Sequence, residues 1–118
     1  MIKPKALLYP QDGDGPRSAM RKMRKNEISS IIVVDDSKKI MGILRIENAL
    51  EALNKENDDL QDYIEDVPLV EPEATVDELF SQIAGQDIPL PVVDKEKKLM
   101  GIIIKSNVLS NLATEEVV

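Results

Sequence analysis

One stretch of this 118-residue chain occurs twice. Residues 33–44 read VVDDSKKIMGIL and residues 92–103 read VVDKEKKLMGII, so apolar, Asp, Lys and Gly positions recur 59 residues apart. A match of this length indicates the internal duplication of one supersecondary unit. Because a unit of this size buries little apolar surface by itself, we expect the two copies to pack against each other around one core.

Each copy has the pattern of a β-α-β-β-α unit. In the first copy, Gly15 followed by Pro16 is typical of a helix start. The β-branched run 28–34, the polar turn 35–39 and the apolar run 40–44 predict a hairpin. Apolar residues at helical spacing indicate one helix before the hairpin and another after it: Ala19, Met20 and Met23, then Ala49, Leu50 and Leu53.

The second copy repeats this order. Residues 75–78 form a capping-box sequence, with Thr75 at the cap and Glu78 three residues later. Pro89 and Pro91 limit ladder hydrogen bonding, which favours a sheet edge or the mouth of a site. Apolar helical positions lie on both sides of the hairpin: Leu79, Phe80 and Ile83, then Val108, Leu109 and Leu112. We therefore predict an α+β fold of two units with pseudo-twofold symmetry, over residues 1–59 and 60–118.

Two glycines and several apolar helix positions carry further expectations. Gly42 and Gly101 fall at equivalent places at the start of the last strand of each copy, where a small residue permits another backbone segment to approach. The helices are expected to leave an apolar face exposed, which predicts a twofold homodimer. The residues of this face are Met20, Met23, Leu50, Leu109 and Leu112.

Charge is segregated along the chain. The first predicted helix carries Arg17, Arg21, Lys22, Arg24 and Lys25. The stretch 47–66 has eight acidic residues against the single Lys55: Glu47, Glu51, Glu56, Asp58, Asp59, Asp62, Glu65 and Asp66. Either these runs are solvated helix faces and a linker, or they form a regulatory basic patch and an acidic patch whose attraction depends on ionic strength.

Composition excludes several classes of protein. The chain has no Cys and no His, so disulfides, thiolate zinc sites and imidazole general bases are excluded. Only 3% of residues are aromatic and the net charge is -7, whereas nucleic-acid binding favours aromatic and basic surfaces. We expect no catalytic residues, no metal site and no nucleic-acid partner. No apolar run approaches a membrane span and no signal peptide is evident, which predicts a soluble, cytoplasmic protein.

The chain resembles a tandem pair of CBS domains. The resemblance rests on four features that are each present twice: a strand ending in Val-Val-Asp, a polar turn, the sequence Met-Gly-Ile-Leu or Met-Gly-Ile-Ile, and a following helix. Residues 14–24, followed by Ile28-Ser29-Ser30, further resemble the CBS pair at the C-terminus of glycine betaine/proline ABC transporter ATP-binding subunits. The resemblance implies a regulatory module of osmoprotectant uptake, peripheral to the cell membrane. Its partners would be the transporter ATPase domain and membrane permease subunits. The chain has no Gly-x-x-x-x-Gly-Lys-Ser/Thr loop, so the ATPase domain would lie upstream.

In the family that the chain resembles, adenine nucleotides often bind between the copies at a Gly-apolar-apolar-Thr-x-x-Asp motif. Here Arg45 and Ile104 replace the Thr, and Asn48 and Asn107 replace the Asp. The resemblance therefore makes these four residues and Lys105 the candidate ligand contacts, with Arg45 or Lys105 placed to meet a phosphate. The candidate regulatory ligand is an adenine nucleotide or cyclic di-AMP, and no cofactor is required. The alternative is that Asn48 and Asn107 cap the helices that they begin.

Two functions from different classes remain open. One is a sensing module that responds to ionic strength or to an adenine nucleotide and acts on a transporter ATPase. The other is a structural dimerisation module with empty clefts. Segregated charge favours the first, and the replaced motif residues favour the second. An enzyme is the weakest interpretation, because Asp35 and Asp94 lie at predicted turns, where Asp is typical of turn stabilisation.

Overall fold

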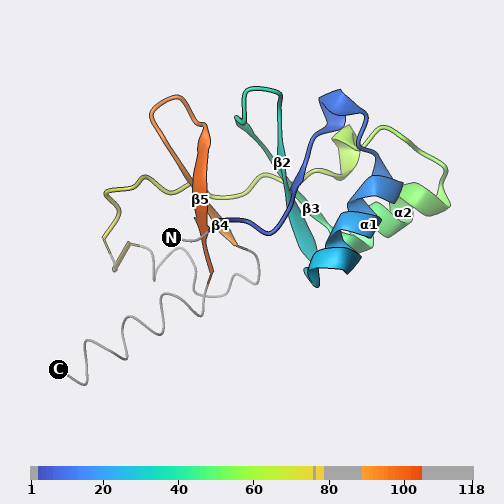
Figure 1. The fold of residues 1–118 in the computed structure, drawn as a ribbon, viewed down its shortest axis with the longest axis horizontal. Coiled ribbons are helices and arrows are strands. Elements are labelled where there is room, and N and C mark those ends of the chain that lie inside the picture. Colours follow the sequence, from blue (N-terminus) through green and yellow to red (C-terminus); the bar gives the residue numbers. More distant parts are fainter. Residues whose placement is uncertain (1–2, 76, 79–88, 105–118) are drawn as a thin grey trace, which may run out of the picture. The chain divides into compact units, whose positions relative to one another are not determined.

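A computed structural model describes residues 3–75, 77–78 and 89–104 of the chain (Figure 1). Contacts divide the chain into two compact units. We call Pro4–Val67 the N-terminal unit, and Pro68–Val118 with Met1–Lys3 the C-terminal unit. Both contain the antiparallel hairpin expected from the repeat, and the predicted α+β class is confirmed.

The N-terminal unit, all of which is described, contains a three-stranded sheet in the order β1-β2-β3. Strand β2 (Ser30–Val34) pairs in parallel with the short β1 (Leu7–Leu8) and antiparallel with β3 (Ile40–Arg45). Helices α1 (Pro16–Asn26) and α2 (Ile46–Asn54) lie side by side (Figure 1). Two 3₁₀ turns complete the unit, η1 (Pro10–Asp12) and η2 (Gln61–Tyr63).

The core of this unit lies between the helices and one face of the sheet. Alternate strand residues share a face, so Ile31, Val33 and Leu44 point together toward the small and flexible side chains of the helices. The buried cluster consists of Leu8, Ala19, Met23, Ile31, Val33, Leu44, Ala49, Ala52 and Leu60. The buried residues of α2, Ala49 and Ala52, have small side chains, which let this helix pack closely against α1 and the sheet.

The expected start of the first helix is confirmed. Gly15 is the N-cap of α1 and Pro16 occupies the first helical position, where its missing N–H leaves no hydrogen bond unmade. The helix ends at Asn26, and the C-cap residue Glu27 adopts the left-handed conformation (φ 55°) and donates its N–H to the carbonyls of Arg24 and Met23. The chain then enters β2 at Ser30, two residues later than the predicted strand start at Ile28.

The turns of the two hairpins are built alike. The Asp35 carboxylate accepts the backbone N–H of Ser37 at 2.8 Å and of Lys39 at 3.0 Å, and the Asp35 carbonyl accepts the N–H of Lys38 at 3.0 Å. The equivalent contacts of Asp94 in the second hairpin have the same distances. The interpretation of both residues as turn-stabilising is therefore confirmed.

The C-terminal unit repeats the hairpin. Within residues 89–104, β4 (Leu90–Val93) pairs antiparallel with β5 (Leu99–Ile103). Val70 forms a parallel bridge on the other side of β4, donating its N–H to the Pro91 carbonyl at 2.9 Å and accepting the N–H of Val93 at 2.9 Å. Pro91 thus directs its backbone toward this short bridge, where its missing N–H breaks no bond with β5.

The predicted capping box is also present. Glu78 donates its N–H to the Thr75 hydroxyl at 3.2 Å, and the Glu78 carboxylate accepts the N–H of Thr75 at 3.1 Å. These reciprocal bonds satisfy donors that a helix start leaves unpaired. The helical positions predicted farther along lie outside the described residues: Leu79, Phe80, Ile83, Val108, Leu109 and Leu112.

The expected exposed apolar face is wrong at both methionines of α1. Met23 is fully buried, and Met20 packs against the core cluster. Both side chains belong to the core-facing side of α1, which sequence periodicity alone did not distinguish from an outer face. Leu50 on α2 is 46% exposed, as expected, while Leu109 and Leu112 lie outside the described residues. The homodimer itself stays a prediction.

Candidate functional site

The two candidate contacts of the first copy come from the junction of β3 and α2. Arg45 ends β3 and is the N-cap of α2, and Asn48 is the third residue of the helix. The interpretation of Asn48 as a capping residue is therefore wrong. The helix starts earlier than expected, at Ile46, whose N–H donates to the Ser29 carbonyl at 2.9 Å as the chain leaves the sheet.

Arg45 and Asn48 meet at a third residue, Glu65. Nε of Arg45 donates to Oε2 of Glu65 at 3.2 Å, and Nδ2 of Asn48 donates to Oε1 of the same carboxylate at 3.0 Å. Asn48 Nδ2 also lies 3.4 Å from the carbonyl oxygen of Tyr63. The side chains of Arg45 and Glu65 are 29% and 45% exposed, so the cluster is open to solvent.

Backbone contacts hold Glu65 beside β3. Ile43 donates its N–H to the Glu65 carbonyl at 2.9 Å, and Glu65 donates its N–H to the Ile43 carbonyl at 2.9 Å. Gly42 makes room for this segment, since a Cβ there would lie 2.5 Å from both the Glu65 carbonyl oxygen and Ile64 Cγ2. The expected close approach at Gly42 is confirmed, although the glycine is the third residue of β3 rather than its first.

The second copy is described only up to Ile104. Gly101 pairs with Val92 in the same register as Gly42 with Val33, and a bulge follows in each pair. Ile104 comes directly after β5 and is half-buried. Lys105 and Asn107 lie outside the described residues, so their part in a ligand site stays a prediction.

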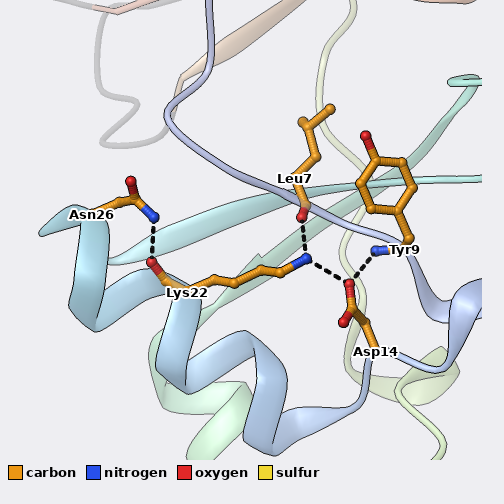
Figure 2. Close-up of polar contacts among 5 residues, drawn as sticks. All are labelled: Leu7, Tyr9, Asp14, Lys22 and Asn26. Atoms are coloured by element: carbon orange, nitrogen blue, oxygen red, sulfur yellow. Dashed lines mark hydrogen bonds and ion pairs between the residues drawn. The ribbon is translucent and has the colours of Figure 1, made fainter.

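The basic residues of α1 occupy two different environments. Arg17, Arg21, Arg24 and Lys25 are exposed, whereas Lys22 is half-buried. Figure 2 shows the Lys22 side chain reaching away from its helix, with Nζ 3.0 Å from the Leu7 carbonyl oxygen and 2.7 Å from Asp14 Oδ2. We use the term exposed basic face for the four other residues. Lys22 instead fastens β1 and the turn at Asp14 to α1.

The contacts of Lys22 also lower the pKa of Asp14. The same oxygen, Oδ2, accepts the backbone N–H of Tyr9 at 2.9 Å, and the Lys22 ammonium lies 5.5 Å from the centre of the Tyr9 ring (Figure 2). Partial burial would raise the pKa of Asp14, but the hydrogen bonds from Lys22 and Tyr9 outweigh it, so this pKa lies below its usual value. The carboxylate therefore stays ionised to lower pH than that of an ordinary Asp and keeps its ion pair with Lys22.

The eight acidic residues of the stretch 47–66 are all exposed. Some have local partners, such as Glu51, which pairs with Lys55 at 3.0 Å one helical turn away. Sequence reasoning named Glu65 only as one of these eight, although it is the residue that joins Arg45 to Asn48. The glycine at position 42 was the signal that another segment crosses there, but it did not say which segment.

Among residues 3–75, 77–78 and 89–104, no helix has the length and apolar composition needed to cross a membrane. The same residues contain no group of three or more acidic side chains placed to hold a metal ion.

Curated proteins similar to the chain are subunits of transporters. It is 33% identical over 100 residues to the glycine betaine transport ATP-binding protein OpuAA of Bacillus subtilis, covering 84% of this chain and 24% of that protein. It is 30% identical over 118 residues to the glycine betaine/carnitine transport ATP-binding protein GbuA of Listeria monocytogenes, covering 99% and 29%. The chain thus spans about a quarter of the length of these relatives.

Solved structures show the same fold. Staphylococcus aureus OpuCA superposes with a TM-score of 0.83 at 24% identity, covering 98% of this chain and 97% of that chain. CbpB in complex with c-di-AMP superposes with a TM-score of 0.77 at 19% identity, covering 92% and 77%. The profile of the CBS domain matches residues 11–55 and again residues 60–114. The chain belongs to the CBS domain family and carries two copies of the domain.

Proposed function

We propose that this chain is the regulatory part of an ATP-binding subunit of a glycine betaine ABC transporter. The observation that carries the proposal is the similarity to OpuAA and GbuA, which extends over 84% and 99% of this chain. The chain has no phosphate-binding loop of its own, so ATP hydrolysis would belong to another part of the subunit. Its partners would then be that ATPase domain, the permease subunits and a second copy of the chain.

In this proposal an adenine nucleotide or cyclic di-AMP is the regulatory ligand. The first copy, residues 1–59, would contribute Arg45 and Asn48, and the second, residues 60–118, would contribute Ile104, Lys105 and Asn107. Support comes from the geometry around Arg45, where a guanidinium and an amide lie side by side in a solvent-open cluster, both donating to the Glu65 carboxylate. Both groups are hydrogen-bond donors suited to phosphate or ribose oxygens. Further support is that CbpB, which shares the fold, has been solved with c-di-AMP.

A thermal-shift measurement on the 118-residue chain tests ligand binding. AMP, ATP and cyclic di-AMP are added separately to the wild type, to Arg45→Ala and to the matched control Arg21→Ala on the exposed basic face. A ligand present at 100 times its Kd stabilises the folded state by about 2.7 kcal/mol, which raises Tm by roughly 5–15 °C. The proposal expects this rise in the wild type and in Arg21→Ala, and a smaller one in Arg45→Ala. No rise with any of the three nucleotides would contradict it.

The exposed basic face supports ionic strength as a second input. Its four cations lie on one helix and project into solvent, so their attraction to an anionic surface weakens as salt rises. Any single exposed pair contributes little, and only the cluster can produce a response. Replacing Arg17, Arg21, Arg24 and Lys25 by Gln, while keeping Lys22, should flatten the salt dependence of transport by the subunit that contains this chain. If the salt dependence of transport is unchanged, the exposed basic face is only a solvated surface and ionic strength is not an input through it.

One observation favours the alternative of a structural dimerisation module. The Glu65 carboxylate already occupies donors of Arg45 and Asn48, so the first-copy site is satisfied without a ligand. Light scattering distinguishes the two functions when it is combined with the thermal-shift screen. A stable dimer with no response to any nucleotide would support the structural module, and a nucleotide response would support the sensor.

A further inference from the structure

Glu65 is an acidic side chain inside the proposed nucleotide site. Its two carboxylate oxygens lie 3.2 Å from Arg45 Nε and 3.0 Å from Asn48 Nδ2. These contacts orient the carboxylate but leave lone pairs on both oxygens. With 45% of the Glu65 side chain exposed, a ligand that contacts Arg45 or Asn48 can also reach this carboxylate.

The backbone of Glu65 prevents the residue from moving away as a whole. Two hydrogen bonds with Ile43, both 2.9 Å, hold the Glu65 backbone along β3. Gly42 has no Cβ and so leaves the space that residues 64–65 occupy. The backbone contacts do not involve the carboxylate. The Glu65 side chain can therefore be substituted while its backbone stays in place, so the effect of the carboxylate charge can be measured.

The charge of Glu65 affects which chemical groups of a ligand bind at this site. Arg45 and Glu65 together carry no net charge, so a phosphate that approaches the guanidinium also meets a carboxylate within a few ångströms. At a separation of about 5 Å in a water-like medium, repulsion between two unit charges lowers binding by about fourfold. A neutral hydroxyl group meets no such penalty, because it can donate a hydrogen bond to the remaining lone pairs of the carboxylate.

We propose that Glu65 determines the specificity of the first-copy site, disfavouring the phosphate of a nucleotide and favouring its neutral, hydroxyl-bearing nucleoside part. This inference rests on the proposed function, since it assigns a role to Glu65 within that binding site. The phosphate groups of a bound nucleotide would accordingly lie away from Glu65, and its sugar hydroxyls would lie toward it.

Adenosine and AMP are the matched probes, because they differ only in the phosphate. Their Kd values are measured by isothermal titration calorimetry at low salt with the wild-type chain, Glu65→Gln and the control Glu51→Gln. The control removes an equal charge from an exposed carboxylate that pairs with Lys55 and not with Arg45. In Glu65→Gln the ratio of the AMP Kd to the adenosine Kd should fall by about 5- to 15-fold, since AMP carries up to two negative charges. The ratio should stay within about twofold in the control.

Three results would overturn the inference. An unchanged ratio in Glu65→Gln, with AMP and adenosine both bound by the wild type, would refute the specificity role and leave the proposed function standing. An equal fall in Glu51→Gln would assign the effect to net charge. Failure of every variant to bind either probe would overturn the specificity role, whereas the proposed function is tested separately by the thermal-shift response to ATP and cyclic di-AMP. Glu65→Ala serves as a second variant if Glu65→Gln is poorly folded, and it should shift the ratio in the same direction.

Discussion

The substitution Gly42→Ala tests the contact that positions Glu65. Gly42 has φ of 151°, a conformation that other residues rarely adopt, and a Cβ at this position would lie 2.5 Å from the Glu65 carbonyl oxygen and from Ile64 Cγ2. Backbone strain contributes about 1–3 kcal/mol. Displacing the 64–65 segment also weakens two backbone hydrogen bonds, at about 1 kcal/mol each. We expect the free energy of unfolding to fall by about 3–5 kcal/mol.

Gly13→Ala is the matched control for this substitution. Gly13 also has positive φ, at 99°, but a Cβ there would have no described atom within 4 Å. Its substitution therefore reports backbone strain without overlap, and should cost about 1 kcal/mol. Because Gly101 has the same register as Gly42, Gly101→Val should also destabilise the chain.

Urea denaturation followed by far-ultraviolet circular dichroism measures these differences. With a slope of about 1–3 kcal/mol per molar urea, Gly42→Ala should lower the midpoint by roughly 2 M, and Gly13→Ala by roughly a quarter of that. Equal midpoint shifts for the two variants would refute the argument that the 64–65 segment is seated against Gly42.

Three further variants, together with one control, are measured by the same urea assay. Lys22→Gln should lower the free energy of unfolding by about 1 kcal/mol, because it removes the Asp14 ion pair, whereas the exposed Arg21→Gln should change it by less than about 0.5 kcal/mol; equal effects would contradict the fastening role. Because the folded-state pKa of Asp14 is lowered, the contribution of its carboxylate to the free energy of unfolding is complete above pH of about 4 and is lost as pH falls through the folded-state pKa. The variant Asp14→Asn should therefore be less stable than the wild type at pH 7, and it should lose less stability than the wild type when the pH is lowered. Lys38, with φ of 64°, occupies the left-handed position of its turn, so Lys38→Asn should stabilise the chain by about 0.5 kcal/mol, and a loss of stability would count against this.

Features set by neighbours in the sequence could be predicted from it. The helix start at Gly15 and Pro16, the turns closed by Asp35 and Asp94, and the capping box at Thr75 each depend on residues within four positions. Their hydrogen bonds are nearly independent of tertiary packing, so residue type and spacing were sufficient. The repeated pattern then located the second hairpin.

Features that join distant segments could not be predicted in this way. Glu65 lies 20 residues from Arg45, and its role depends on a segment crossing beside β3, which periodicity does not encode. Lys22 resembled its basic neighbours on α1 because its partners, Leu7 and Asp14, come from other parts of the fold. The burial of Met23 was missed for the same reason, since the inner face of a helix is defined by what packs against it.

Backbone-amide NMR of the 118-residue chain, titrated with AMP or cyclic di-AMP, tests the central claim most directly. If the first copy holds a regulatory nucleotide site, the amide signals of Arg45, Asn48 and Glu65 should shift in a saturable manner, while those of the Asp35 turn should not. An absence of shifts at millimolar nucleotide, or shifts confined to other residues, would contradict the account.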